Sequence, residues 1–557
     1  MSRQSRSSKR KSVILILLCL ILFVLLIIGG WGARRFFPYP TVFARLGIEN
    51  WQVWEFHDYF DLDPAVLSIV IEDQRLRDLE DGPSLVNGEI YFPVSFIREH
   101  IDPFIFWDDK AQSIFISTDT EVIRLSGSPM ISADFLMERY PWLVNHRLEY
   151  NVLMLTDKQN TVERSALATR RTPVRYRPDS TAFITQYIPR NGSITLFHRD
   201  GDFYRVRTEE GLLGYISVDQ AGLINILPFP RVAETPVSAP PLELPISLTW
   251  EMITAPQGNV TAMNHPLPEG LTVISPTWFN FDPYSPDGTL ISFASREYVK
   301  WAHLQGVMVW AKVFDTNQDI SSEILTDYQA RRHVVNQLVQ AVQTYNLDGI
   351  NINFEHIRSS DGEYYVQFLR ELAPEMRRLN VVLSVATFVP APWFAHYHHY
   401  LIGRTVDFVA IMTYDEHFGG SQNPGPVASL PFVRRSVVST LELIPKERIL
   451  LGLPFYNRLW RVAPDGSHTS SLYGMGRPWT LVEEWGIIPV WDAEAGSYYA
   501  NFVTEDNITY RIWIECERSI GEKLRVFSEY ELAGVAGWRR RLETPGVWDE
   551  IYRVLWN

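Results

Sequence analysis

Short apolar runs recur through the C-terminal half of the chain, and stretches with helical periodicity, such as 321–345 and 361–379, separate several of them. Apolar strands that alternate with helices indicate a parallel sheet. The eight runs that we interpret as strands are 246–253, 271–281, 306–314, 349–355, 381–389, 407–415, 449–456 and 534–541. Eight such repeats predict an α/β fold in which residues 246–557 close into a (β/α)8 TIM barrel.

The fourth predicted strand carries a polar stripe in an apolar run. In DGININFE (348–355), Asn351, Asn353 and Glu355 occupy alternate positions. Alternate residues of a strand share one face, so we expect these three side chains in the lumen and the apolar residues between them against the helices. Glu355 ends the strand, where barrel enzymes build their active sites. The pattern favours catalysis; a strand with polar packing is the alternative.

Two smaller regions and a linker are predicted before the barrel. Residues 40–160 contain short strands and a short helix, which predicts an α+β domain. Residues 165–227 contain short β-rich runs divided by turn dipeptides, which is typical of a small β-barrel. Residues 228–245 hold six prolines among few charges, which predicts an extended linker.

The N-terminus begins with a basic tail, residues 1–12, and continues with an unbroken apolar run from Val13 to Ile28. Residues 13–31 reach about the length needed to span a bilayer. The basic flank predicts a cytoplasmic N-terminus and an extracellular remainder, so the expected location is the cell membrane with a single-pass signal anchor. A cleaved signal peptide is the main alternative, and a buried core helix is the other.

Composition narrows the possible partners. The chain has 46% hydrophobic and 21% charged residues, as ordinary globular proteins do. Its net charge of -14 argues against a nucleic-acid partner. Of the two cysteines, Cys19 lies in the apolar N-terminal run, so Cys516 has no partner for a disulfide or a zinc cluster in the folded part. No cluster of residues suggests a metal or an organic cofactor.

Several segments of residues 246–557 resemble glycoside hydrolase family 18. DGININFE (348–355) is similar to the family signature D-x-x-D-x-D-x-E, in which the final Glu is the proton donor. Segments 409–433, 444–460 and 532–551 resemble the sixth, seventh and eighth strand regions of the family's spore-cortex-lytic, SleL-like branch. The resemblance implies retaining hydrolysis in which the substrate's own acetamido oxygen attacks the anomeric carbon and forms an oxazolinium-like intermediate.

The resemblance also implies roles for individual residues. Glu355 would protonate the leaving oxygen and later deprotonate water, and position 353 would orient the acetamido group. Tyr414 matches the M-x-Y-D motif that lines the cleaved subsite, and Trp538 matches the aromatic floor on which an apolar sugar face stacks. The predicted substrate-binding residues are Asn351, Met412, Asp415, Glu416 and Trp538.

The sequence departs from the signature at two positions, where Asn351 and Asn353 replace aspartates. Asn353 can accept a hydrogen bond from the acetamido N–H, but it brings no negative charge to the intermediate. Asp348 remains and could partly compensate, although strand alternation places it off the face of Asn353 and Glu355. The predicted catalytic set is therefore Glu355, Asn353, Asp348 and Tyr414.

The regions before the barrel carry resemblances of their own. Residues 40–160 resemble the small copper amine oxidase N-terminal-like domain of exported bacterial proteins, a name that implies no copper. Residues 165–227 resemble a bacterial SH3 domain through 203–206 and 214–216, which implies binding to wall peptide; a simple spacer is the alternative.

These features together predict a membrane-anchored extracellular hydrolase of β-1,4-linked N-acetylglucosamine in peptidoglycan. A barrel that only binds glycans is the main alternative, and a chitinase is a less favoured one.

Overall fold

The computed structural model describes residues 67–76, 79, 81–118, 120–148, 151–158, 165–180, 182, 184–223, 242–315 and 317–556. The predicted tail 1–12, the anchor 13–31 and most of the linker 228–245 lie outside these residues. Within them, no helix has the length and apolar character needed to cross a membrane. The chain divides into two compact units, Met1–Ile97 with Met130–Glu234 and Arg98–Pro129 with Thr235–Asn557.

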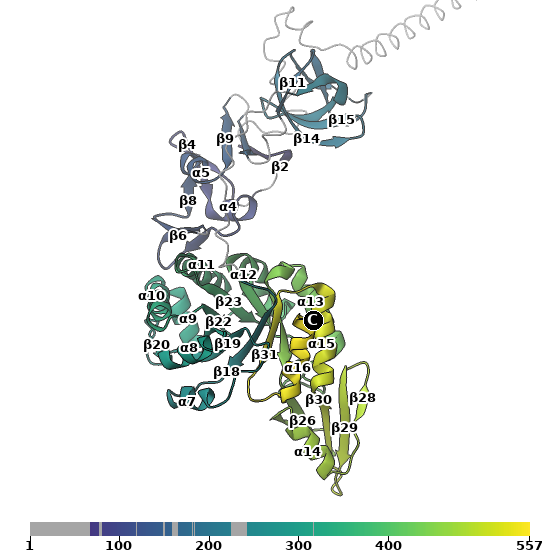
Figure 1. Cartoon of the computed structure of the whole chain (residues 1–557). Helices are drawn as coiled ribbons and strands as arrows, with labels where there is room; N and C mark the ends of the chain where they lie inside the picture. Colours follow the sequence, from purple (N-terminus) through teal and green to yellow (C-terminus); the bar gives the residue numbers. More distant parts are fainter. Residues whose placement is uncertain are drawn as a thin grey trace, which may run out of the picture. The chain divides into compact units, whose positions relative to one another are not determined.

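Eight parallel strands of the second unit close into a barrel (Figure 1). They are β18 (Ile246–Glu251), β19 (Val273–Phe281), β21 (Met308–Phe314), β22 (Gly349–Asn353), β23 (Val382–Thr387), β24 (Phe408–Ile411), β25 (Ile449–Pro454) and β31 (Gly534–Trp538). Strand β18 closes the ring because it pairs with both β19 and β31. All eight predicted strands, and the predicted barrel, are confirmed.

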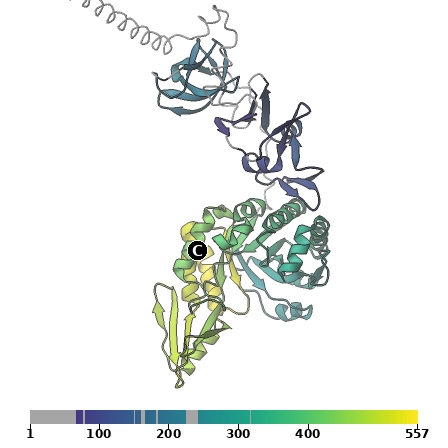
Figure 2. The same ribbon diagram turned by 180° about the vertical axis from the view of Figure 1, so that it is seen from behind.

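Helices surround the barrel strands, as Figures 1 and 2 show from opposite sides. They are α7 (Gln257–Met263), α8 (Arg296–His303), α9 (Gln318–Thr326), α10 (Tyr328–Tyr345), α11 (Gly362–Arg378), α12 (His399–Thr405), α13 (Leu430–Leu441), α15 (Glu517–Tyr530) and α16 (Pro545–Trp556). Ile350, Ile352 and Phe354 are buried in the apolar core that includes residues of these helices. A second apolar cluster, with Trp250 and Trp310, fills the lumen. The predicted alternation along β22 is confirmed.

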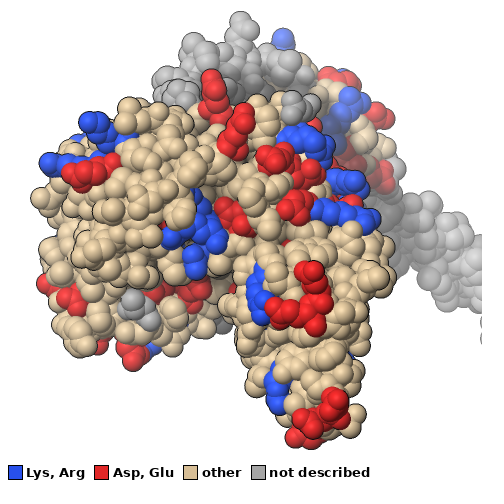
Figure 3. Space-filling view, turned by 60° about the horizontal axis from the view of Figure 1, so that its bottom comes forward, with Lys and Arg blue, Asp and Glu red and all other residues tan. Residues whose placement is uncertain are grey.

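An insertion that the sequence analysis missed lies between β25 and β31. It contains β26 (Tyr456–Val462), β27 (His468–Gly474), α14 (Arg477–Glu484), β28 (Val490–Asp492), β29 (Ser497–Val503) and β30 (Thr509–Ile514). Its five strands form an antiparallel sheet around Leu459, Ile512 and Ile514. Figure 3 shows the insertion projecting from the body of the barrel, with acidic and basic side chains interspersed over a largely uncharged face.

The first unit consists mainly of antiparallel strands. Its largest sheet has the order β13-β12-β16-β15-β14-β11-β17 and packs around Val174, Val206 and Ile216. The strands of this sheet are β11 (Ser165–Ala168), β12 (Thr172–Arg175), β13 (Ile184–Ile188), β14 (Ser193–Asp200), β15 (Phe203–Thr208), β16 (Leu213–Ser217) and β17 (Ala221–Leu223). The sheet lies within the predicted domain 165–227, and its resemblance to an SH3 domain stays a prediction.

The rest of the first unit holds shorter elements. They are β1 (Ser68–Ile71), β2 (Gln74–Leu76), β3 (Ser84–Val86), β4 (Glu89–Pro93), α4 (Val94–His100), β8 (Met130–Ser132), α5 (Ala133–Arg139), β9 (Trp142–Arg147) and β10 (Val152–Asp157), with α4 running into the second unit. The short strands and the short helix that the sequence predicts for this region are found here. The likeness to a copper amine oxidase N-terminal-like domain stays a prediction.

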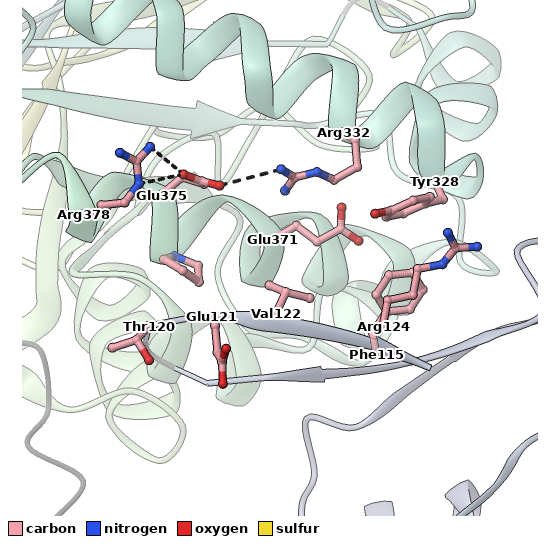
Figure 4. A pocket seen from close by; sticks show the side chains of 11 residues that line it. Phe115, Thr120, Glu121, Val122, Arg124, Tyr328, Arg332, Glu371, Glu375 and Arg378 are labelled. Carbon is pink, nitrogen blue, oxygen red and sulfur yellow. Dashed lines mark hydrogen bonds and ion pairs between the residues drawn. The ribbon is translucent and has the colours of Figure 1, made fainter. Parts of the chain in front are cut away.

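Residues 98–129 belong to the same compact unit as the barrel, so the predicted domain 40–160 is divided in the structure. They contain β5 (Phe106–Asp108), β6 (Ser113–Ser117) and β7 (Val122–Ser126). A cavity of about 320 Å³ lies between this segment and helices α10 and α11. Figure 4 shows Phe115 and Val122 on one side of the cavity and Tyr328 and Glu371 on the other.

A buried ionic network joins this segment to the barrel. Arg331 Nη2 donates to Asp108 Oδ2 over 2.9 Å, and Arg331 Nε donates to Glu371 Oε1 over 3.1 Å. All three side chains are at most 1% exposed. A buried ion pair adds little net stability over an apolar pair, but the removal of one partner leaves the other charge uncompensated.

We therefore expect Asp108→Asn to lower the free energy of unfolding of the second unit by about 1.5–3 kcal/mol, the value of a hydrogen bond to a charged group. The change keeps the shape of the side chain and removes its charge beside Arg331. Denaturant unfolding followed by tryptophan fluorescence measures the effect. The matched control is Asp109→Asn, because Asp109 is the exposed neighbour. Equal stability of the two variants would show that the network contributes nothing.

Candidate active site

Glu355 lies just beyond the carboxyl end of β22, and its side chain is exposed. The backbone around it is held by Asp315, which directly follows β21. The N–H of Glu355 donates to Asp315 Oδ1 over 2.8 Å, and the N–H of His356 donates to Oδ2 over 2.6 Å. Asp315 is 5% exposed and also accepts a hydrogen bond from Ser321 Oγ. Asp315 therefore fixes the direction in which the Glu355 side chain leaves the barrel.

The two asparagines of the stripe lie in the lumen, as predicted. Asn351 is fully buried: its Oδ1 accepts from Trp250 Nε1 and its Nδ2 donates to Ser384 Oγ, each over 3.0 Å. Both polar groups of the Asn351 side chain are thus bonded to neighbouring strands, and Asn351 stabilises the packing of the lumen. The prediction that Asn351 is a substrate ligand is therefore wrong.

Asn353 lies nearer the mouth of the barrel, and its side chain makes fewer hydrogen bonds than that of Asn351. Its Nδ2 donates to the carbonyl oxygen of Ala386 over 3.3 Å. Within the described part of the chain, its Oδ1 accepts no hydrogen bond. That oxygen could accept one from a substrate N–H.

Trp538 ends β31 and forms part of an aromatic floor. Its ring centroid lies 5.6 Å from that of Trp250, and the side chain is partly exposed. Lys312 of β21 lies on the same floor, with Nζ 4.5 Å from the Trp538 ring centroid. The sequence analysis missed Lys312, although a lysine inside the apolar run GVMVWAKVF, two positions after Trp310, was a visible signal.

Tyr414 interacts electrostatically with Glu355 and lies next to a second tyrosine and an ion pair. Tyr414 is buried, and burial raises its pKa well above the usual value, with the charges of Glu355 and Asp415 adding to the effect. Its hydroxyl therefore stays protonated and can donate a hydrogen bond. Tyr456 packs edge-on against Tyr414, with ring centroids 6.2 Å apart. Arg458 Nη2 lies 3.4 Å from Asp415 Oδ1, so the predicted residue Asp415 is held next to Tyr414.

The structure corrects the prediction that Asp348 belongs to the catalytic set. Asp348 precedes β22, at the end of the strand opposite to Glu355, and it lies five positions before Asn353, roughly 16 Å along the strand. Its Oδ2 accepts from the N–H of Val309 and lies 2.7 Å from His303 Nε2. Asp348 therefore stabilises the amino-terminal end of the barrel through these contacts. It is too far from Asn353 to supply the negative charge that is missing there.

Glu416 and Met412 also have structural contacts. Glu416 Oε2 accepts from the N–H of Ser429, the residue that caps α13, over 2.7 Å. This bond anchors the loop after β24, and the role of Glu416 as a substrate ligand stays a prediction. Met412 is partly buried against the core between strands and helices. Among the described residues, no group of three or more His, Cys, Asp or Glu side chains could hold a metal ion.

Burial lowers the pKa of Lys312 from 10.5 to about 8, while Glu355 and Asp315 oppose the shift. Between about pH 8 and about pH 10.5 the unfolded chain holds a proton that the folded chain has lost, so the free energy of unfolding should rise with pH there. The shift corresponds to a rise on the order of 3 kcal/mol. Denaturant unfolding across this range measures it, and Lys312→Met should remove the rise. A rise that persists in the variant would contradict this assignment.

A closed barrel with an acidic side chain at the carboxyl end of a strand is the arrangement of barrel enzymes. The comparisons with known proteins agree with this class. Residues 316–543 match the family model Glycosyl hydrolases family 18, so the chain contains a domain of that family. The crystal structure of a chitinase from Chromobacterium violaceum ATCC 12472 covers 56% of this chain and 100% of its own, with 19% identity and a TM-score of 0.50. That likeness shows the fold.

Three relatives come from Bacillus subtilis (strain 168). "Putative sporulation-specific glycosylase YdhD" is 29% identical over 237 residues, which cover 41% of this chain and 56% of that protein. "Uncharacterized glycosylase YvbX" is 25% identical over 283 residues, 48% of this chain and 81% of that protein. "Cortical fragment-lytic enzyme" is 26% identical over 243 residues, 42% and 56% respectively. The match thus spans about half the length of two of these relatives.

Proposed function

We propose that the chain hydrolyses β-1,4-linked N-acetylglucosamine glycans in peptidoglycan of the cell wall or spore cortex, with retention of configuration. The observation that carries the proposal is Glu355, an exposed carboxyl at the carboxyl end of a barrel strand whose backbone is fixed by Asp315. Relatives described as a sporulation glycosylase and a cortical fragment-lytic enzyme support this substrate class.

Each site residue has its own role in a substrate-assisted reaction. Glu355 gives a proton to the leaving oxygen and later takes one from water. The free Oδ1 of Asn353 accepts the acetamido N–H, and the hydroxyl of Tyr414 donates to a sugar or acetamido oxygen. The partly exposed face of Trp538 stacks on the apolar face of the sugar.

A second candidate function is glycan binding without hydrolysis. It is favoured by the neutral side chain of Asn353 and the cationic side chain of Lys312, since neither supplies negative charge to an oxazolinium-like intermediate. A chitinase is a third candidate and is supported less well by the spore-related relatives.

The proposed location is the outer face of the cell membrane, with residues 13–31 as the anchor and the SH3-like region as a wall contact. The amino-acid pattern of the N-terminus supports it. Membrane fractionation of cells with and without alkaline carbonate extraction tests the anchor. Release of the full-length chain by carbonate would contradict it.

The test of the proposed function incubates the full chain with purified peptidoglycan and, separately, with chitin oligosaccharides. Mass spectrometry of the products identifies the bond that is cleaved. Proton NMR of the newly formed reducing ends reports the anomeric configuration. Reducing-end N-acetylglucosamine with retained configuration from peptidoglycan is the expected result. Binding to peptidoglycan without products would select the second candidate, and faster cleavage of chitin oligosaccharides would select the third.

A further inference from the structure

Lys312 is a buried cation in the lumen of the barrel. It is 5% exposed and follows Trp310 by two residues on β21, so both side chains share the lumenal face. The strand register places Lys312 beside Asn351 of β22. Its Nζ lies 4.5 Å from the centre of the Trp538 ring and 5.7 Å from that of Phe314.

No carboxylate of the described residues lies within 4 Å of the Lys312 ammonium. The nearest acids have other surroundings. Asp315 accepts hydrogen bonds from the backbone N–H groups of Glu355 and His356 and from Ser321, and its Oδ1 lies 3.1 Å from His356 Nδ1. Glu355 is exposed at the mouth of the barrel. Lys312 is therefore buried without a carboxylate of its own in contact.

Such a placement is costly unless something else pairs with the charge. An ammonium removed from water loses more hydration free energy than a nearby aromatic face returns. Other buried cations of this unit have a partner: Arg331 contacts Asp108, and Lys523 contacts Glu515 over 2.8 Å. Lys312 is the exception among these three.

We propose that Lys312 forms an anion subsite that binds the carboxylate of an acidic sugar linked to the N-acetylglucosamine that stacks on Trp538. This inference rests on the proposed function, because it places a glycan in the same site and narrows its class. Because Nζ lies 4.5 Å from the centre of the Trp538 ring, this subsite adjoins the sugar that stacks on that ring. The ligand is then a glycan in which N-acetylglucosamine alternates with a carboxylated sugar.

The sugar carboxylate has two chemical sources, a lactyl ether as in muramic acid and a hexuronate. Full-length Glu355→Gln protein is the binding partner, so that no ligand is cleaved during the experiment. Calorimetry at neutral pH compares three tetrasaccharides: neutral chitotetraose, a muramyl tetrasaccharide with free lactyl carboxylates, and a hyaluronan tetrasaccharide. At least one acidic tetrasaccharide should bind roughly tenfold to hundredfold more tightly than chitotetraose, as for a charge-assisted hydrogen bond.

Substitutions test whether Lys312 causes the preference for acidic tetrasaccharides. In the same background, Lys312→Met should remove the preference for the acidic ligand and Lys312→Arg should keep most of it. The control Lys300→Met should leave it unchanged, because Lys300 is an exposed residue of α8. If Lys312→Met fails to fold, the preference of the parent protein should fall as the pH is raised above about 8, where Lys312 loses its charge.

Equal affinity for neutral and acidic tetrasaccharides would overturn the proposal, and so would a preference that survives Lys312→Met or the rise in pH. These results do not depend on turnover. Loss of the proposed hydrolytic function would appear as an absence of products from the wild type, while the carboxylate preference would persist.

Discussion

Glu355→Gln should lower the rate of glycan hydrolysis by about 10²–10⁴-fold, because general acid–base catalysis by one positioned group contributes that much. Glutamine has nearly the same shape but can neither give a proton to the leaving oxygen nor take one from water. The Glu355 side chain is exposed, and its backbone is held by Asp315 through an N–H that the substitution keeps. The fold and glycan binding should therefore survive while kcat falls.

Release of reducing ends from purified peptidoglycan, measured at saturating substrate, reports this loss. The matched control is Glu323→Gln on α9, where the glutamate is also exposed but has no proposed role in the reaction. Full activity in Glu355→Gln would show that another residue supplies the proton. Equal loss in both variants would indicate that the assay reports folding.

The positions of the barrel strands and of Glu355 could be predicted because local pattern determines them. A strand of period two in a fully buried sheet has one face toward the helices and one toward the lumen, so the identity of each side chain indicates its face. Asn351, Asn353 and Glu355 followed this rule. The same rule warned that Asp348 lies off that face, and the structure places it at the other end of the strand.

Contacts between segments that lie far apart in the sequence could not be predicted in this way. Asp315 and Glu355 meet only because β21 and β22 are neighbours in register, and nothing within either segment states that pairing. Lys312 meets Trp538 across the lumen, because the barrel closes. Arg331 and Asp108 are brought together by packing of the segment 98–129 on the barrel, whereas the sequence pattern assigned that segment to a separate domain.

The insertion was missed for a different reason. Its strands are rich in aromatic and β-branched residues, as strands commonly are, but they stand between two barrel strands that were both recognised. The distance from β25 to β31 along the chain exceeds what one helix and its loops require. That length was the signal for an additional sheet.

Asn353→Asp should raise kcat by about 10²–10³-fold, the usual effect of one preorganised electrostatic group. The wild-type side chain donates to the carbonyl oxygen of Ala386 over 3.3 Å, a contact that aspartate would lose. In exchange, a carboxylate in the lumen would face the positive charge that develops on the acetamido carbon and nitrogen. Its cost of burial would be reduced by Lys312, whose ammonium has no carboxylate within 4 Å among the described residues.

The change should therefore appear in kcat more than in KM, since the intermediate carries the charge and the bound ground state does not. The control Asn501→Asp places the same substitution on an exposed position of β29 and should leave both constants unchanged. If the wild type shows no turnover and only Asn353→Asp releases products, the natural barrel is a glycan-binding protein. If the wild type is active and Asn353→Asp gains nothing, the asparagine oxygen alone suffices to orient the acetamido group, and charge stabilisation in this barrel comes from elsewhere.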